Sequence, residues 1–141
     1  MKKHQDTAIL LLRIALAIGF LSAVSSRLGL WGAHSSGWDN FVAYTEKVNS
    51  FAPQKSIPII AILSTVLETT FALLLLIGYK TRLMATGAAI LTTLFALAMT
   101  YSFGIKDPLD YSVFAFATAA FLLSTMPQYR WSIDQLLEKK N

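Results

Sequence analysis

Residues 57–103 read IPIIAILSTVLETTFALLLLIGYKTRLMATGAAILTTLFALAMTYSF, and this stretch decides the fold. Its first part, 57–79, is apolar except for one charge, Glu68, and its second part, 83–103, contains no charge. Each part is close to the ~20 residues that a helix needs to cross a ~30 Å hydrocarbon layer. Because only the short link ending at Arg82 separates them, they are predicted to form an antiparallel pair of transmembrane helices.

Two further apolar runs flank this pair. The first is 8–25, interrupted only by Arg13, and the last is 109–126, with Asp110 near its start. Charged residues make up 14% of the chain and hydrophobic residues 55%, whereas a soluble domain usually carries about a quarter charged residues. The sequence therefore predicts one all-α domain, 1–141, built as a four-transmembrane-helix bundle.

Glycine and proline mark two helix ends. Gly78 is expected to close the helix that contains Glu68, and Pro127 is expected to end the last helix. Gly19 and Gly87 lie inside apolar runs, where glycine typically allows two helices to approach closely.

The distribution of Lys and Arg predicts the orientation in the membrane. Seven lie in the two tails and the link between the second and third runs, and four lie in the loops 26–56 and 104–108. The positive-inside rule then places both termini, including the segment 127–141, in the cytoplasm of a bacterial inner (plasma) membrane. The alternative is that Lys2, Lys3 and the first apolar run form a cleaved signal peptide, which Arg13 argues against.

Composition also limits the chemistry. The net charge is +4, but the basic residues are scattered, so nucleic-acid binding is not expected. There is no cysteine, which excludes thiol chemistry and iron–sulfur clusters. His4 and His34 fall on opposite sides of the predicted membrane and cannot share a metal or a haem. A redox enzyme that works alone is therefore not expected, and any quinone would be a diffusible ligand.

The outer loop 26–56 contains a predicted amphipathic helix near 38–51. One helical face of this segment carries Trp38, Phe41, Val42, Thr45 and Val48. Two interpretations remain open: an anchor at the membrane interface, or a lid over a ligand site.

Intramembrane charges are the candidate functional residues, because a charge at mid-bilayer costs at least ~2.5–3.5 kcal/mol. Arg13 lies roughly 9 Å and Glu68 roughly 16 Å from the cytoplasmic edge at 1.5 Å per residue. Helical side chains lean toward their own N-terminus, so these two diverge. Direct pairing, pairing through a water or ligand, and snorkelling of Arg13 to the interface all remain open.

The full candidate site is an intramembrane polar or ligand-binding site. It comprises Arg13, Glu68, Ser64, Thr65, Asp110, Tyr101 and Tyr111. An outward-opening pocket that joins Glu68 to Asp110 and the two tyrosines is one hypothesis, and an aromatic wall from Phe71, Phe95 or Phe103 is another.

Several segments together resemble the DoxX family of small bacterial membrane proteins. The most specific stretch is Glu68 followed by LLLIGYKTR at 74–82. Further matching positions are Leu12-Arg13, Phe51-Ala52-Pro53, Asp110 and Ser132-Ile133-Asp134-Gln135-Leu136. The chain departs from the family where a Gly-x-Gly turn usually precedes the last segment, because it has Met-Pro-Gln-Tyr at 126–129.

The resemblance implies a membrane subunit of a quinone-linked oxidoreductase, such as one that oxidises thiosulfate, or a partner of a membrane-associated oxidative-stress complex. We therefore expect an accessory subunit that docks a soluble redox partner and contacts quinone. Two alternatives are a binding or transport protein for a lipid or another small amphipathic molecule, which would act as a homodimer, and a purely structural assembly factor.

Overall fold

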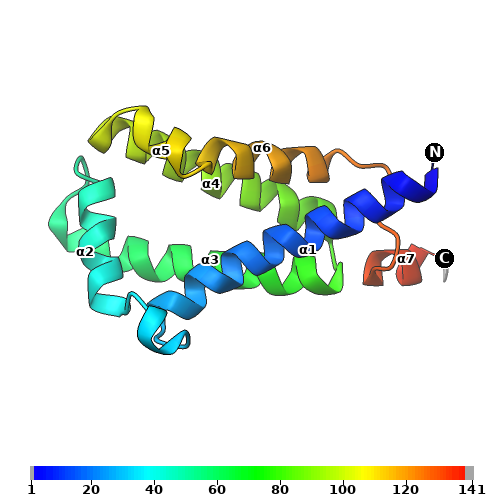
Figure 1. The fold of residues 1–141 in the computed structure, drawn as a ribbon, viewed down its shortest axis with the longest axis horizontal. Helices are drawn as coiled ribbons and strands as arrows, with labels where there is room; N and C mark the ends of the chain where they lie inside the picture. Colours follow the sequence, from blue (N-terminus) through cyan, green and yellow to red (C-terminus); the bar gives the residue numbers. More distant parts are fainter. Residues whose placement is uncertain (1, 139–141) are drawn as a thin grey trace.

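The computed structural model describes residues 2–138, and all regular secondary structure in this range is helical. Three helices are long and apolar enough to cross a membrane: α1 (Lys2–Arg27), α3 (Ile57–Ile77) and α4 (Thr81–Phe103). They lie side by side and run lengthwise through the molecule (Figure 1). The all-helical prediction is confirmed. α1 begins at Lys2 and α4 at Thr81, earlier than the starts at residues 8 and 83 that the sequence indicated.

The turn between α3 and α4 forms as predicted around Gly78. The N–H of Gly78 donates to the carbonyl of Leu75 and that of Tyr79 to the carbonyl of Leu74, which is a Schellman C-cap. Gly78 has φ 71°, a left-handed conformation that glycine adopts without steric cost. The chain then reverses at once, so α3 and α4 are an antiparallel hairpin.

Small residues allow the helices to approach closely in the core. Ala17, Ala72, Ala85 and Ala120, one from each of the four main helices, are completely buried. A Cβ at Gly19 would come within 2.9 Å of Phe116, and a Cβ at Gly87 within 2.7 Å of Phe71. The predicted role of these two glycines is therefore confirmed.

The last apolar run is broken into two helices, α5 (Lys106–Asp110) and α6 (Val113–Ser124). The break falls at Ser112, which has φ 57°. The prediction of one helix over 109–126 is therefore wrong in its first turn. At 1.5 Å per residue the 12 residues of α6 extend about 18 Å. Within residues 2–138, three helices and not four meet the length expected of a span.

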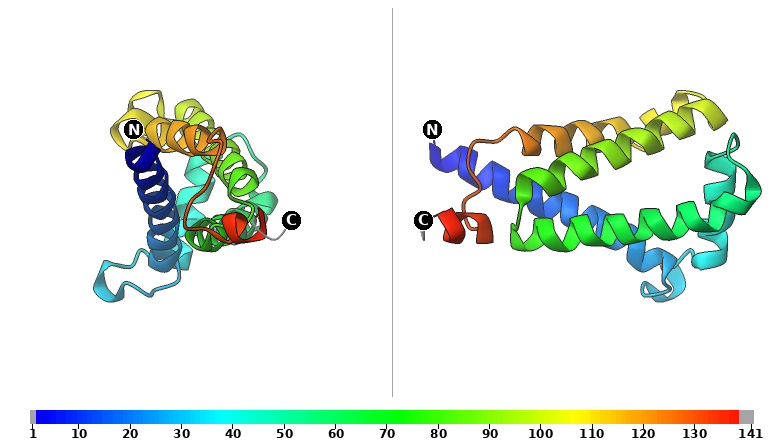
Figure 2. Two further views of the ribbon diagram at one scale, coloured as in Figure 1. Left: turned by 90° about the vertical axis from the view of Figure 1, so that its right-hand side faces the viewer. Right: turned by 180° about the vertical axis from the view of Figure 1, so that it is seen from behind.

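The outer loop contains the predicted amphipathic helix, α2 (Trp38–Val48), preceded by the short 3₁₀ turn Gly32–His34 and followed by another, Gln54–Ser56. Thr45 and Val48 are its buried residues. The helix lies across one end of α3 and α4 and contacts both (Figure 2). It therefore closes that end of the bundle.

At the opposite end, residues 125–132 cross from α6 to the last helix, α7 (Ile133–Glu138), beside the α3–α4 turn. Ser132 caps α7, because its Oγ accepts the N–H of Gln135 at 3.2 Å. Arg130 pairs with Asp6 at 3.2 Å and ties this segment to α1. The starts of α1 and α7 therefore lie at the same end of the molecule (Figure 1).

Candidate functional site

Glu68 forms a buried ion pair with Arg27. Nη2 of Arg27 lies 2.9 Å from Oε2 and 3.1 Å from Oε1 of Glu68. The Glu68 side chain is 2% exposed and that of Arg27 is 12% exposed. Direct pairing of Glu68 with Arg13, one of the arrangements left open by the sequence, is therefore wrong.

Side-chain direction explains why Arg27 is the partner. Arg27 is the last residue of α1 and leans back toward the middle of the bundle, whereas Glu68 on the antiparallel α3 leans toward the outer loop. The two side chains converge, while Arg13 and Glu68 diverge. The same rule could have identified Arg27 from the sequence, but the predicted first helix ended at residue 25 and left Arg27 in the loop.

Thr65 completes this polar group, and Ser64 does not join it. Nη1 of Arg27 donates to Oγ1 of Thr65 at 3.3 Å, and that hydroxyl donates to the carbonyl of Ala61 at 2.8 Å. Ser64 is also buried and donates to Ala61 at 3.1 Å, but it lines the groove between α3 and α4. The site is therefore Arg27, Glu68 and Thr65.

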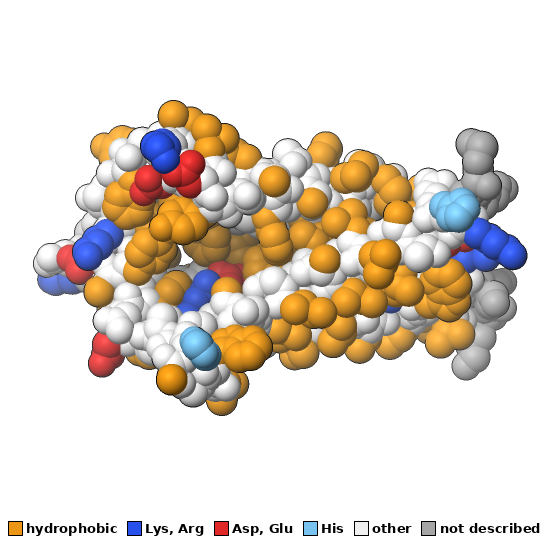
Figure 3. Space-filling model, in the orientation of Figure 1, with side chains coloured by type: hydrophobic (Ala, Val, Ile, Leu, Met, Phe, Trp, Pro, Cys, Tyr) orange, Lys and Arg blue, Asp and Glu red, His pale blue; other side chains and the backbone are white. Residues whose placement is uncertain are grey.

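A cavity of about 140 Å³ lies over the Arg27 guanidinium. Its walls are mostly apolar and come from α2, α4 and the start of α6: Phe41, Tyr44, Thr45, Val48, Asn49, Phe95, Met99 and Val113. Figure 3 shows the molecule hollowed beside α2, with basic and acidic atoms at the bottom of the hollow. Arg27 is the charged residue of the cavity wall, and its Cζ lies 3.9 Å from the centre of the Phe41 ring.

Tyr44 on α2 is one of the residues that line the cavity. Burial raises the pKa of Tyr44, and the nearby Tyr111 and Asp107 raise it further. The hydroxyl therefore keeps its proton at physiological pH and can donate a hydrogen bond. The Arg27 guanidinium is the charged donor that the cavity wall offers to a carbonyl oxygen.

Arg13 lies at the opposite end, under residues 127–132. Its Nη2 donates to the carbonyl of Trp131 at 2.7 Å, and the residue is 2% exposed. Nε and Nη1 are buried without a hydrogen-bond partner among the described atoms. The Arg13 side chain leans toward the N-terminus of α1. It is covered by protein, so it does not reach the surface of the molecule, as free snorkelling would require.

Asp110, Tyr101 and Tyr111 are not brought together with Glu68. Asp110 pairs with Lys106 on the surface of α5. Tyr101 is 73% exposed and packs edge-on against Phe51, with ring centres 5.4 Å apart. Tyr111 is 72% exposed. The structure therefore separates these outer residues from the Arg27–Glu68 pair.

The predicted aromatic wall is divided. Phe95 lines the cavity, Phe71 is buried in the core against Gly87, and Phe103 packs near Tyr44 with ring centres 6.3 Å apart. Across residues 2–138, no group of three or more His, Asp or Glu side chains could hold a metal ion. The site thus offers hydrogen bonds and an apolar cavity as its means of binding.

Comparison with protein families identifies one match: the DoxX family model matches residues 8–102. The matched region includes most of α1, all of α2 and α3 and nearly all of α4, and so contains Arg27, Glu68 and Thr65. Searches of curated proteins and of solved structures found no match.

Proposed function

Because the chain belongs to the DoxX family of membrane proteins, we propose that it is a quinone-contacting accessory subunit of a membrane-associated oxidoreductase complex. Its quinone ring would bind in the cavity over Arg27. The observation that carries this proposal is the buried Arg27–Glu68 pair beside an apolar cavity. A buried charged pair is costly to maintain, so its position next to an apolar cavity favours a polar ligand atom there.

The size of the cavity favours a single ring. Its volume of about 140 Å³ is close to the ~150 Å³ of an apolar cavity that holds one benzene molecule. Ligand pockets for larger molecules are usually about 300–1,000 Å³. A quinone headgroup meets the volume and the chemistry together, since its carbonyl oxygens need donors and its ring needs an apolar wall.

Arg27 supplies the donor that a quinone carbonyl needs. Its guanidinium lines the cavity and would donate to that oxygen, while Glu68 pairs with the guanidinium and would hold it in place. Phe41 would lie against the ring, as it already does against the guanidinium. These side chains bind and orient the ring, whereas the electrons would come from a soluble redox partner.

A path for the quinone tail lies between α3 and α4. A groove of about 590 Å³ runs along these helices and shares Asn49 and Phe95 with the cavity. Apart from Asn49, Ser64 and Tyr101 its walls are apolar, and many of them are exposed. An isoprenoid chain would leave the cavity past Phe95 and continue into the surrounding lipid.

The proposed topology places this cavity toward the outside of the bacterial inner membrane. Both termini and the α3–α4 turn would be cytoplasmic, because these segments carry most of the Lys and Arg residues. The α5–α6 segment would form the fourth crossing despite its break. α2 would then act as a lid over the cavity, since Phe41, Tyr44 and Val48 supply one of its walls.

The test is native mass spectrometry of the protein purified in mild detergent with its endogenous lipids. The wild type is expected to retain quinone. E68Q and R27Q are expected to retain about tenfold less, the effect of one hydrogen bond to a charged group. K106Q, which changes an exposed base on α5, is the matched control and should behave as the wild type.

A second variant separates binding from folding. R27M/E68M removes the pair without leaving a buried charge alone, and such replacements are often neutral for stability. It should fold and still lack quinone. A wild type that retains only phospholipid would refute the quinone proposal and favour a structural role, for which the same pair serves to hold α1 against α3.

A further inference from the structure

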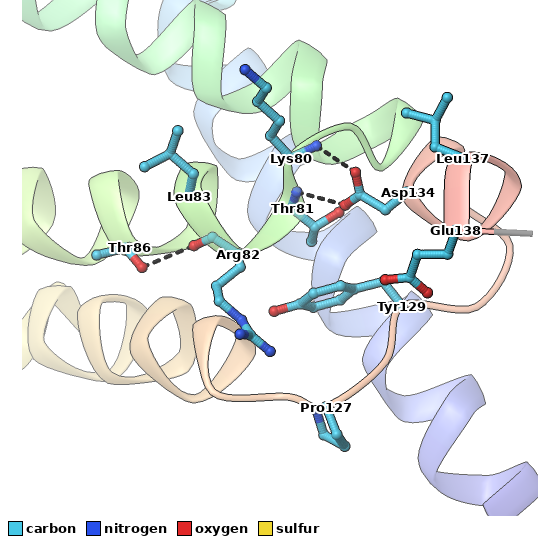
Figure 4. Close-up of a pocket in the computed structure, with 10 residues that line it drawn as sticks. All are labelled: Lys80, Thr81, Arg82, Leu83, Thr86, Pro127, Tyr129, Asp134, Leu137 and Glu138. Atoms are coloured by element: carbon cyan, nitrogen blue, oxygen red, sulfur yellow. Dashed lines mark hydrogen bonds between the residues drawn. The ribbon is translucent and has the colours of Figure 1, made fainter. Parts of the chain in front are cut away.

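A second pocket, of about 660 Å³, opens at the end of the bundle that carries both termini. It lies between the first turn of α4, the segment before α7, and α7 itself (Figure 4). The residues that matter here are Arg82, Leu83, Tyr129, Asp134, Leu137 and Glu138. None of them belongs to the Arg27 cavity, so this pocket does not depend on the quinone proposal.

Charges of both signs line the pocket. Arg82 and Lys80 are basic, and Asp134 and Glu138 are acidic, so the lining has no net charge. The Asp134 carboxylate accepts the N–H groups of Lys80 at 2.7 Å and Thr81 at 2.8 Å, which caps α4. Because the lining is balanced, it suits a group that carries a positive and a negative charge at once.

The accessible charges are Arg82 and Glu138. The Arg82 side chain extends toward Tyr129 and Pro127, while the Lys80 side chain points away from Arg82 (Figure 4). Nη2 of Arg82 donates to the carbonyl of Met126 at 3.1 Å, and its other N–H groups can reach a ligand. Glu138, on α7, lines the same pocket.

These groups are arranged in order along the bundle. Leu83 and Thr86 lie within the apolar helix α4, Arg82 lies in its first turn, and α7 with Glu138 lies beyond the end of α3 and α4 (Figure 1). Going outward from the membrane, the pocket therefore presents apolar, basic and acidic groups. A phospholipid presents acyl chain and glycerol, then phosphate, then its terminal group.

We propose that this pocket binds the headgroup of phosphatidylethanolamine, with the phosphate on Arg82 and the ammonium on Glu138. The primary ammonium donates hydrogen bonds to a carboxylate, and the quaternary ammonium of phosphatidylcholine has no N–H to donate. Phosphatidylglycerol brings no positive charge to Glu138. Leu83, which is exposed and lies on the membrane side of Arg82, would contact the upper acyl chains.

The experiment measures retained lipid by native mass spectrometry after exchange into nanodiscs of equal phosphatidylethanolamine, phosphatidylcholine and phosphatidylglycerol. The wild type should be enriched in phosphatidylethanolamine over both others. R82Q should reduce the total retained lipid about tenfold and E138Q should reduce that enrichment about tenfold, each the effect of one charge-assisted hydrogen bond. K106Q and E46Q remove one base and one acid at the opposite end and should leave both unchanged.

Selectivity among the three lipids distinguishes the phosphate contact at Arg82 from the ammonium contact at Glu138. E138Q should lose the preference over phosphatidylglycerol, whereas R82Q should weaken all three lipids. Equal retention of the three lipids by the wild type would overturn the proposal, as would unchanged enrichment in E138Q or unchanged total lipid in R82Q. Displacement of the lipid by millimolar inorganic phosphate would overturn it too, because the site would then be one for free anions. Quinone content is read from the same spectra, so failure of either proposal is seen separately.

Discussion

Removal of one member of the Arg27–Glu68 pair should destabilise the protein strongly. The Glu68 side chain is 2% exposed, so E68Q leaves the Arg27 guanidinium, itself 12% exposed, without its counter-charge. Breaking a buried pair from one side costs about 3–5 kcal/mol. For a domain of this size each kcal/mol lowers Tm by about 4 °C, so we expect a loss of roughly 12–20 °C.

Thermal unfolding in detergent, followed by tryptophan fluorescence, measures this loss. The double variant R27M/E68M should recover most of it, because no buried charge is then left alone. K106Q breaks the exposed Lys106–Asp110 pair and provides the control, for which about 0.3–0.5 kcal/mol is expected. If E68Q and K106Q lowered Tm equally, the pair would be solvated in the membrane-embedded protein and the argument from burial would fail.

Three further predictions concern single residues. G78A should lower Tm by far more than G29A, because both glycines have positive φ but only at Gly78 would a Cβ meet other atoms, 2.4 Å from Ser132 Cβ; equal losses would show that the contact with the C-terminal segment is absent. D134A should cost about 1–2 kcal/mol in thermal unfolding, since the carboxylate caps the start of α4, and an unchanged Tm would contradict that role. In an ultraviolet pH titration, Y44F should remove a tyrosine that ionises above its ordinary pKa of about 10. Because the folded pKa is raised, the stability that Tyr44 contributes is present below about pH 10 and is lost as the pH rises through the folded pKa.

The fold was largely predictable where the signal is local. Gly78, the charge-free run 83–103 and the amphipathic pattern around Phe41 each determine structure within a few residues, and the hairpin and α2 form where expected. The break at Ser112 was missed, because the segment has neither glycine nor proline there to indicate it.

The site was only partly predictable, because it depends on how deep in the bundle each polar residue lies. Glu68 and Thr65 were identified from their place inside an apolar run. Arg27 was missed, since two residues of error in a helix end moved it from the bundle into the loop. Arg13 was identified as important, but its partner is a backbone carbonyl 118 residues away, which no local pattern encodes.

The hydrogen bond between Arg13 and Trp131 also constrains the order in which the protein can fold. Arg13 emerges from the ribosome with the first helix, whereas its acceptor on Trp131 follows 118 residues later, roughly 6–24 s at ordinary rates of synthesis. During that interval the guanidinium must remain at the membrane surface or bind a temporary partner. The first helix is therefore expected to reach its final depth only after Trp131 has been synthesised, because until then the Arg13 guanidinium lacks its acceptor.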